Sequence, residues 1–375
     1  MQHRVNILTW RLLAGASLAI LAGCAAVPDL KNPGPSWPAS PSVIAHRGAS
    51  ALRPEHTLAA YRTAIEDGAD SVEPDLVATR DGVLVARHEN EISGTTNVAQ
   101  LPQFAARKTT KTIDGAAVTG WFTEDFTLAE LRQLRARERI PANRPANSAY
   151  DGQFPVPTLQ EVIDLVEQES RARRRTIGLV PELKHPSYFK AIGLPLERRV
   201  VEVLTANGYR GRDAAVLIQS FEISNLKELR AMSGFRLVQL VSMPGEAPYD
   251  AVAAGSGLTY ADMITPGGLR EIARYADVVG PYKTIVVPRD AAGNLVTPTR
   301  FVQDARAAGL AVHVWTMRPE NPFLPTGLRA EPVDSPSQRG DAGGEIRAYL
   351  EAGVDAVFTD DPATGRVAVD AFRLR

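Results

Sequence analysis

Polar residues that could carry out phosphate chemistry recur in this chain, each time beside a short apolar run. The set contains two histidines, three carboxylates, one arginine and one lysine: His46, His88, Glu73, Asp75, Glu182, Arg47 and Lys184. Carboxylates can hold a divalent metal ion, cations can bind phosphate, and imidazoles can transfer protons. None of these residues is specific by itself, but the ordered set predicts a site that cleaves phosphodiesters.

The positions of the three acids suggest that their side chains converge. Glu73 and Asp75 are two residues apart, so they share a face of an extended backbone. Pro74 lies between them and Pro181 precedes Glu182. Because proline cannot donate to a central strand ladder, these acids are expected where strands leave a sheet.

Two arrangements could neutralise three converging acids. Repulsion and burial would raise the carboxyl pKa values unless a cation is present. A hard divalent cation, Ca²⁺ or Mg²⁺, takes oxygen ligands and would resolve the conflict. The alternative is a closed ring of salt bridges to Arg47 and Lys184.

The composition is typical of a folded globular protein, with 44% hydrophobic and 23% charged residues among 375. A net charge of −1 gives no electrostatic footprint for nucleic acid, so no nucleic-acid partner is expected. Cys24 is the only cysteine, so the domain must be stable without a disulfide.

Residues 1–41 are predicted to lie outside the catalytic domain. Basic residues precede the apolar run Leu12–Leu21, which is short for a bilayer span. The run leads to Leu21-Ala22-Gly23-Cys24, which resembles the bacterial lipobox. We therefore expect a signal peptide over residues 1–23, a lipid anchor at Cys24 and a tether over residues 24–41, rich in Pro, Gly and Ser.

This reading predicts an exported lipoprotein that is held at a membrane, on the periplasmic face or at the cell surface. An ordinary secretory signal with an incidental cysteine is the alternative. The sequence does not determine which membrane would hold the anchor, nor the oligomeric state.

From residue 42 the chain alternates short β-branched runs with amphipathic stretches. Strands are expected at residues 42–46, 71–76, 176–184, 215–221, 237–241, 278–279 (with an extension to 287 left open), 311–316 and 356–359. Helices are expected at residues 57–67, 128–135, 158–173, 195–207, 225–232, 268–275, 299–308 and 345–352. This alternation favours a (β/α)8 TIM barrel over residues 42–375 rather than a doubly wound sheet. Residues 91–157 break the rhythm and are expected to form a small inserted subdomain after the second strand, over the barrel mouth.

The motifs resemble those of the glycerophosphodiester phosphodiesterase family, and more narrowly those of its exported bacterial members. The resemblance covers nearly all of residues 42–362. The motifs that carry it are His46–Gly48, Pro54–Thr57, Glu73–Asp75, Gly120–Thr127, Pro157–Leu159, Glu182–Lys184, Gln219–Phe221, Val314–Thr316 and Thr359–Pro362. The resemblance also implies a barrel with a subdomain inserted after the second strand.

Site roles follow from the same resemblance, residue by residue. The family's metal ligands match Glu73, Asp75 and Glu182, and its acid/base histidines match His46 and His88. Its phosphate-contacting arginine matches Arg47 and a second cation near the phosphate matches Lys184. Gln219 and Trp315 match substrate-side positions. The chain has His56 where the family usually has Asn, and Glu89 where it usually has Asp, so the fine substrate preference is open.

The expected activity is metal-dependent hydrolysis of small-molecule glycerophosphodiesters to sn-glycerol 3-phosphate and an alcohol. The metal would lower the pKa of a bound hydroxyl, one histidine would accept its proton, and the other would protonate the leaving alcohol. Which histidine is the acid is not determined. The alternatives are a phospholipase that acts on intact or lyso-phospholipids, and a lipoprotein that binds phosphodiesters without cleaving them.

The remaining histidines have plainer explanations. His56 is expected to support the loop before the first helix, and His185 to lie at the rim or on the surface. His313 lies in an apolar run and is expected in the core or beside the site. Trp315 could fill the barrel or form a wall against the glycerol group.

Overall fold

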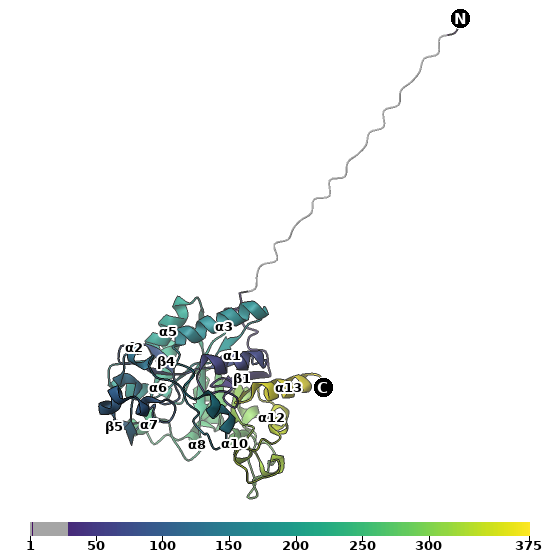
Figure 1. Ribbon diagram of the computed structural model, residues 1–375. Coiled ribbons are helices and arrows are strands. Elements are labelled where there is room, and N and C mark those ends of the chain that lie inside the picture. Colours follow the sequence, from purple (N-terminus) through teal and green to yellow (C-terminus); the bar gives the residue numbers. More distant parts are fainter. Residues whose placement is uncertain (1, 3–28) are drawn as a thin grey trace.

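A closed ring of parallel strands forms the centre of the structure, a computed structural model that describes residue 2 and residues 29–375. The ring contains β1 (Ser42–His46), β2 (Ser71–Glu73) with β3 (Asp75–Ala78), β7 (Gly178–Leu179) with β8 (Glu182–Leu183), β9 (Leu217–Ser220), β10 (Arg236–Val241), β11 (Val278–Pro281), β12 (Ala311–Met317) and β13 (Ala356–Thr359). The ring closes because β1 pairs with both β2 and β13. Helices surround the strands (Figure 1). The predicted (β/α)8 barrel is therefore confirmed.

Two strands of the ring are interrupted at prolines. Residues 71–76 and 176–184 were each expected to form one continuous strand, but Pro74 separates β2 from β3 and Pro181 lies between β7 and β8. Proline has no N–H to donate to the neighbouring strand, so the ladder breaks there. β3 resumes in register with β8, which aligns Asp75 with Glu182.

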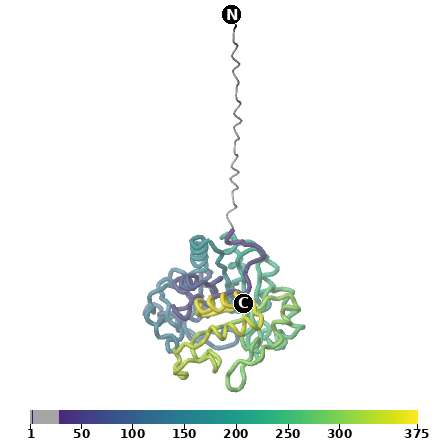
Figure 2. Tube along the Cα trace, turned by 90° about the vertical axis from the view of Figure 1, so that its right-hand side faces the viewer, coloured from purple at the N-terminus to yellow at the C-terminus, as the bar shows by residue number. Residues whose placement is uncertain are grey.

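The outer helices alternate with the strands. The longer ones are α1 (Leu58–Glu66), α3 (Leu159–Arg173), α5 (Glu197–Ala206), α6 (Ile223–Met232), α9 (Pro266–Ile272), α11 (Phe301–Ala307), α12 (Ala342–Glu351) and α13 (Pro362–Arg373). Thr57 and Thr158 cap the first two, each accepting a hydrogen bond from a first-turn N–H. α13 was not predicted, and it lies beside the first elements of the barrel in both views (Figures 1 and 2).

Short helices occupy several of the loops after the strands: α4 (Pro186–Ala191), α7 (Tyr249–Ala253), α8 (Tyr260–Met263) and α10 (Lys283–Val286). The extension of the sixth strand toward residue 287 is therefore wrong, because β11 ends at Pro281 and the chain turns into α10.

The base of the barrel, at the amino ends of the strands, is closed by residues that precede β1. Trp37 packs among the apolar side chains inside the ring, including Ile44, Val180 and Phe358. The Lys31 ammonium donates to the carbonyl oxygen of Asn207 at 2.6 Å. The tether prediction for residues 24–41 therefore needs correction over residues 29–41, which lie against the barrel.

The predicted signal peptide, Cys24 and residues 25–28 fall outside the described residues. Among residue 2 and residues 29–375, the structure contains no helix that is both long enough and apolar enough to span a bilayer.

Residues 91–157 have a structure of their own and contact the barrel rim. They contain the hairpin of β5 (Thr109–Ile113) and β6 (Ala116–Gly120), and helix α2 (Leu128–Leu131), which is shorter than the predicted helix at 128–135. Ahead of them, β4 (Leu84–Ala86) pairs antiparallel with β3. The hairpin turn reaches the rim, where Asp114 accepts a hydrogen bond from His185 Nδ1 at 2.6 Å.

Candidate active site

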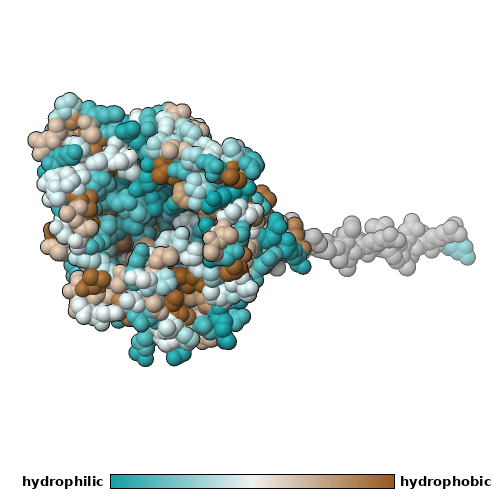
Figure 3. Space-filling model, turned by 90° about the horizontal axis from the view of Figure 1, so that it is seen from below, coloured by the Kyte–Doolittle hydropathy of each residue, from teal (hydrophilic) through white to brown (hydrophobic). Residues whose placement is uncertain are grey.

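The carboxyl ends of the barrel strands surround a hollow whose floor is hydrophilic (Figure 3). At its centre a pocket of about 70 Å³ brings together seven polar side chains from separate strands and the loops after them. Its lining consists of His46, Arg47, Glu73, His88, Glu182, Thr316 and Arg318, with Phe221, Leu240, Trp315 and Phe358 as the apolar part. Most of the residues that the sequence singled out therefore meet in one place.

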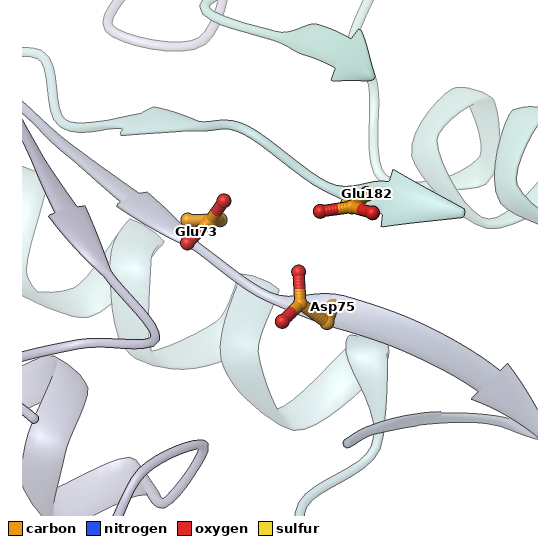
Figure 4. A group of neighbouring side chains, drawn as sticks. All are labelled: Glu73, Asp75 and Glu182. Carbon is orange, nitrogen blue, oxygen red and sulfur yellow. The ribbon is translucent and has the colours of Figure 1, made fainter. Parts of the chain in front are cut away.

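Glu73, Asp75 and Glu182 point toward one another from β2, β3 and β8 (Figure 4). One oxygen of each lies within 4.8 Å of the others. The backbone N–H of Arg47 donates to Glu73 Oε2 at 3.0 Å, and Gln219 Nε2 donates to Glu73 Oε1 at 2.7 Å. These hydrogen bonds fix the direction of the Glu73 carboxylate.

The charges of this triad are only partly balanced by protein groups. Burial and the charge of Asp75 raise the pKa of Glu73 well above its usual value. Burial raises the pKa of Glu182 to about 7, although the Lys184 ammonium opposes the shift. Burial acts on Asp75 in the same direction, but the charge and hydrogen bond of His56 hold the pKa of Asp75 well below its usual value.

A divalent cation fits these carboxylates better than a closed ring of salt bridges does. Lys184 Nζ donates to Glu182 at 2.7 Å, and Arg47 Nε lies 3.7 Å from Asp75 Oδ2. Glu73 breaks the ring, because its partner among the described basic side chains is His46 at 4.0 Å. The buried Asp75 Oδ1 also lacks a hydrogen-bond partner among the described residues. Three buried carboxylates with a free oxygen are a donor set that suits a hard cation.

His46 lies at the end of β1 and is held by a carboxylate that follows the neighbouring strand β13, 314 residues later in the sequence. Its Nδ1 lies 2.5 Å from Asp360 Oδ1. Asp360 is buried and is itself paired with Arg144 and with Arg318, whose Nε lies 3.2 Å away. Burial lowers the pKa of His46 to about 4, so the imidazole is neutral at pH 7.

His88 is held in the same manner on the other side of the pocket. Its Nδ1 bonds to the carboxylate of Glu89, which receives two hydrogen bonds from the Arg139 guanidinium at 2.6 and 3.1 Å. Burial, with the charges of Arg47 and Lys184, lowers the pKa of His88 to about 3. Lys184 Nζ lies 3.3 Å from His88 Nε2.

The two imidazoles therefore present equivalent atoms to the pocket. A neutral imidazole whose Nδ1–H donates to a carboxylate carries its lone pair on Nε2. In His46 this leaves Nε2 as a proton acceptor in the pocket, and in His88 the same atom accepts from the Lys184 ammonium at 3.3 Å. The arrangement can move protons on either side of a group bound between the rings.

The other predicted site residues take distinct places. Arg47 Nη1 donates to Glu55 at 3.1 Å, and its guanidinium lines the pocket. Gln219 is fully buried beneath Glu73. Trp315 lines the pocket as part of its wall, with its Nε1 donating to the carbonyl of Gly280 at 2.8 Å and its ring edge-on to Phe221.

The remaining histidines differ in their distance from the chemistry. His56 is completely buried and contacts the acidic triad directly, in addition to supporting its loop. Its Nε2 bonds to Asp75 at 2.8 Å, and its Nδ1 bonds to the Tyr61 hydroxyl. His185 lies at the rim against Asp114. His313 is buried within β12, away from the pocket lining.

Four charged residues that support the site were not among those selected from the sequence: Asp360, Arg139, Arg144 and Arg318. A signal existed for Asp360, which lies in the Thr359–Pro362 motif directly after the last strand. The arginines had no local signal, because their role depends on residues far away in the sequence, such as Glu55 and Asp360.

Comparison with known proteins agrees with this geometry. The model of the glycerophosphoryl diester phosphodiesterase family matches residues 46–364. A glycerophosphodiester phosphodiesterase of Arabidopsis thaliana is 32% identical over 91% of this chain and 91% of its own length. One from Haemophilus influenzae is 29% identical over 86% of this chain and 88% of its own length.

Solved structures share the fold. An Oleispira antarctica phosphodiesterase, whose structure contains the product sn-glycerol-3-phosphate, has a TM-score of 0.56 at 22% identity and covers 88% of this chain and 97% of its own. Because the family match extends over most of the chain, the protein belongs to the glycerophosphoryl diester phosphodiesterase family.

Proposed function

We propose that the protein hydrolyses glycerophosphodiesters to sn-glycerol 3-phosphate and an alcohol. The observation that carries this proposal is the pair of histidine–carboxylate dyads, His46–Asp360 and His88–Glu89, that face the acidic triad across one pocket. The relatives' names give the same activity.

The proposed reaction depends on a divalent cation, Ca²⁺ or Mg²⁺, held by Glu73, Asp75 and Glu182. When bound, such an ion neutralises phosphate charge and acidifies a hydroxyl group. Arg47 and Lys184 supply the fixed positive charge on the protein side. Gln219 and the Arg47 backbone N–H hold Glu73 in place.

Proton transfer falls to the two imidazoles. An oxygen nucleophile, either water or a glycerol hydroxyl, gives its proton to Nε2 of one histidine as its bond to phosphorus forms. The bond between phosphorus and the leaving alcohol breaks, and the other histidine, as imidazolium, protonates that oxygen. If water is the nucleophile, this step gives sn-glycerol 3-phosphate directly. If the glycerol hydroxyl is the nucleophile, this step gives a cyclic phosphodiester, which water then opens with the two histidines in exchanged roles. The negative charge of the bound diester raises the pKa of a nearby imidazole, which allows one ring to enter the cycle protonated.

Turnover of glycerophosphocholine tests the proposal. The full chain, supplied with Ca²⁺ or Mg²⁺, is expected to release choline and sn-glycerol 3-phosphate in equal amounts. Glycerol 3-phosphate is measured with a coupled dehydrogenase. Binding of the diester without product release would contradict hydrolysis, and would favour a protein that only binds phosphodiesters.

We also propose that the protein is exported and anchored through a lipid on Cys24. The support for this is the sequence Leu21-Ala22-Gly23-Cys24 after a short apolar run.

A further inference from the structure

A second, larger cavity opens beside the catalytic pocket and shares its wall. It has a volume of about 430 Å³, within the range of small-molecule sites, and Glu182 and Phe221 line both spaces. The rest of its wall comes from the loops after β8, β9 and β10, and from Asp114 in the β5–β6 hairpin. A phosphodiester held at the triad therefore has room on this side for one of its two alcohols.

The wall of this cavity combines aromatic rings with carboxylates. Phe221 and Tyr260 pack edge-to-face with ring centres 6.5 Å apart, and Tyr249 lies on the same wall. Aromatic faces attract ammonium groups, whether primary or quaternary. Carboxylates beside these rings add attraction for a cationic alcohol, whereas an uncharged alcohol would gain little from them.

Two of the carboxylates have no cation of their own. Glu222 accepts hydrogen bonds from Ser187, and Glu246 accepts one from Ser242 Oγ at 2.5 Å. Neither forms an ion pair with any lysine, arginine or histidine in residues 29–375. Glu222 is 3% exposed, and burial raises its pKa to about 7, as expected of a carboxyl group without a counter-charge.

The basic groups on the wall are already neutralised by other acids. Lys184 is bonded to Glu182 at 2.7 Å, and His185 to Asp114 at 2.6 Å. The cavity is therefore a negatively charged environment with no free cation among the described residues that line it.

One further polar group lacks a partner. Tyr260 is 3% exposed and lines the cavity, and its hydroxyl makes no hydrogen bond to any described residue. The hydroxyl oxygen itself is not fully buried, so it is open to the cavity and available to a donor group of a ligand.

We infer that this cavity receives the alcohol part of the diester and selects an alcohol that carries an ammonium group, such as choline or ethanolamine. Glu246 supplies the negative charge, and Glu222, whose pKa burial raises to about 7, adds to it when a cation lies beside it. Tyr249 and Tyr260 face the cation, whereas the Phe221 ring already has the Lys184 ammonium 5.6 Å from its centre and only completes the wall. This inference rests on the proposed function, because it names the substrate class of the same site.

Three diesters that release the same phosphate product test the inference. Glycerophosphocholine and glycerophosphoethanolamine carry a cationic alcohol, whereas glycerophosphoglycerol carries a neutral one. For the wild-type protein, kcat/KM is expected to be about tenfold higher for the two cationic diesters. Glu246→Gln should lower the choline-to-glycerol ratio of kcat/KM by about fivefold, because it removes one charge at constant shape.

Matched variants distinguish an effect of the lost charge on substrate preference from an effect on folding. Glu351→Gln makes the same change on α12, outside the cavity lining, and should leave the ratio unchanged. Tyr260→Phe should affect ethanolamine more than choline, because only a primary ammonium has N–H groups to donate to the hydroxyl. A wild-type preference for glycerophosphoglycerol, or a ratio unchanged in both Glu222→Gln and Glu246→Gln, would overturn the inference.

Failure of the proposed function would look different, since none of the three diesters would then release sn-glycerol 3-phosphate. Titration of choline chloride onto the full chain, followed by calorimetry, still tests the cavity in that case. We expect binding to the wild-type protein that weakens about fivefold in Glu246→Gln. Equal binding by both proteins would rule out the ammonium site.

Discussion

His46 and His88 are held by carboxylates whose surroundings differ. Asp360, behind His46, is buried and paired with two arginines, whereas Glu89, behind His88, has a side chain that is 34% exposed. His46 therefore has the more rigid support, and the orientation of His88 depends more on Arg139.

Replacement of either imidazole tests the proposed proton-transfer scheme. His46→Ala and His88→Ala should each reduce kcat by roughly 10²–10⁴-fold, the usual contribution of a general acid or base. The double variant should be far less than multiplicatively worse, because groups that act as one unit are not additive. Wild-type turnover by His88→Ala in a steady-state assay would exclude the scheme.

Metal removal tests the acidic triad. Chelation should abolish turnover, and Ca²⁺ or Mg²⁺ should restore it. Glu73→Gln should weaken metal affinity, because the amide keeps the shape and loses the charge. Loss of a residue that only orients a metal ligand costs roughly 10–100-fold in affinity, and loss of the ligand's charge should cost at least as much. Calorimetric metal titration measures the change, with Glu351→Gln as the control. Full activity after exhaustive dialysis against chelator would be incompatible with the metal-dependent mechanism.

His313 makes the folded state sensitive to acid. Burial lowers the pKa of this group to about 4 in the folded protein, against 6.5 for an ordinary histidine. Its contribution to stability is complete above pH 6.5 and is lost as the pH falls toward 4, since the unfolded chain then binds the proton first. Between pH 7 and pH 5 the loss is about 2 kcal/mol.

His313→Leu should remove that part of the pH dependence while leaving kcat near the wild-type value. Urea unfolding at pH 7 and pH 5 measures it. An unchanged difference in unfolding free energy between the two pH values would show that His313 is not the sensitive group.

The residues of the pocket differ in how far the sequence could identify them. Those that lie at the end of a strand or beside a proline break within a motif, such as His46, Glu73 and Glu182, could be selected because the carboxyl end of a barrel is a place of known geometry. Arg139 and Arg144 could not be selected, because they lie in irregular chain and meet Glu89 and Asp360 only through tertiary packing.

At the scale of elements, the insertion contributes directly to the site through Arg139. This residue joins Glu55, after β1, to Glu89, after β4, with hydrogen bonds of 2.6 Å to each. Arg139→Gln should lower kcat by about tenfold, because His88 loses its fixed carboxylate. It should also cost about 1–3 kcal/mol of unfolding free energy, since Glu55 is buried and keeps only Arg47 as a partner.

Arg137→Gln is the matched control for that experiment. It lies in the same segment, its side chain is more exposed, and its contact with Asp151 is longer, at 3.5 Å. We expect wild-type turnover and a change in stability below about 1 kcal/mol. If both variants behaved alike in kinetics and urea unfolding, the insertion would have no specific role in positioning His88.

The elements themselves were predictable where the hydrophobic period was clear. The ring strands and α3 follow from runs whose apolar spacing matches their burial. The β5–β6 hairpin was not predicted, although the sequence contains a signal for it in the dipeptide Asp114-Gly115. In the structure both residues have positive φ, as a two-residue hairpin turn requires. Pro74 and Pro181 indicate the ends of strands in the sequence, but in the structure each also divides one expected strand into two.

For the whole molecule, the proposed lipid anchor at Cys24 predicts association with a membrane. Cys24→Ser should move the exported protein from the membrane fraction to the aqueous fraction without changing kcat, since the residue precedes residues 42–375, which supply the proposed site. Detergent phase partitioning measures the distribution. A wild-type protein found wholly in the aqueous phase would contradict the lipoprotein proposal.

A phospholipase that enters a bilayer would be expected to expose apolar side chains around its mouth. Within residues 29–375 the strongly exposed large apolar side chains all lie outside the insertion at 91–157, and one of them, Val252, lines the larger cavity. The hollow itself is hydrophilic (Figure 3). The lack of such side chains on the insertion and the hydrophilic hollow favour a water-soluble diester over an intact lipid.

The chain segment that closes the barrel base also determines which way an anchored molecule would face. Asn32 bonds to Gly208 at the base, so the chain leaves the domain on the side opposite the pocket. From Asp29 to Cys24 an extended chain spans at most about 17 Å, less than the domain's own diameter. A molecule attached through Cys24 would therefore stand with its base toward the bilayer and its mouth toward the surrounding water. It would sample headgroup diesters that diffuse past, and not the lipids of the leaflet that holds it.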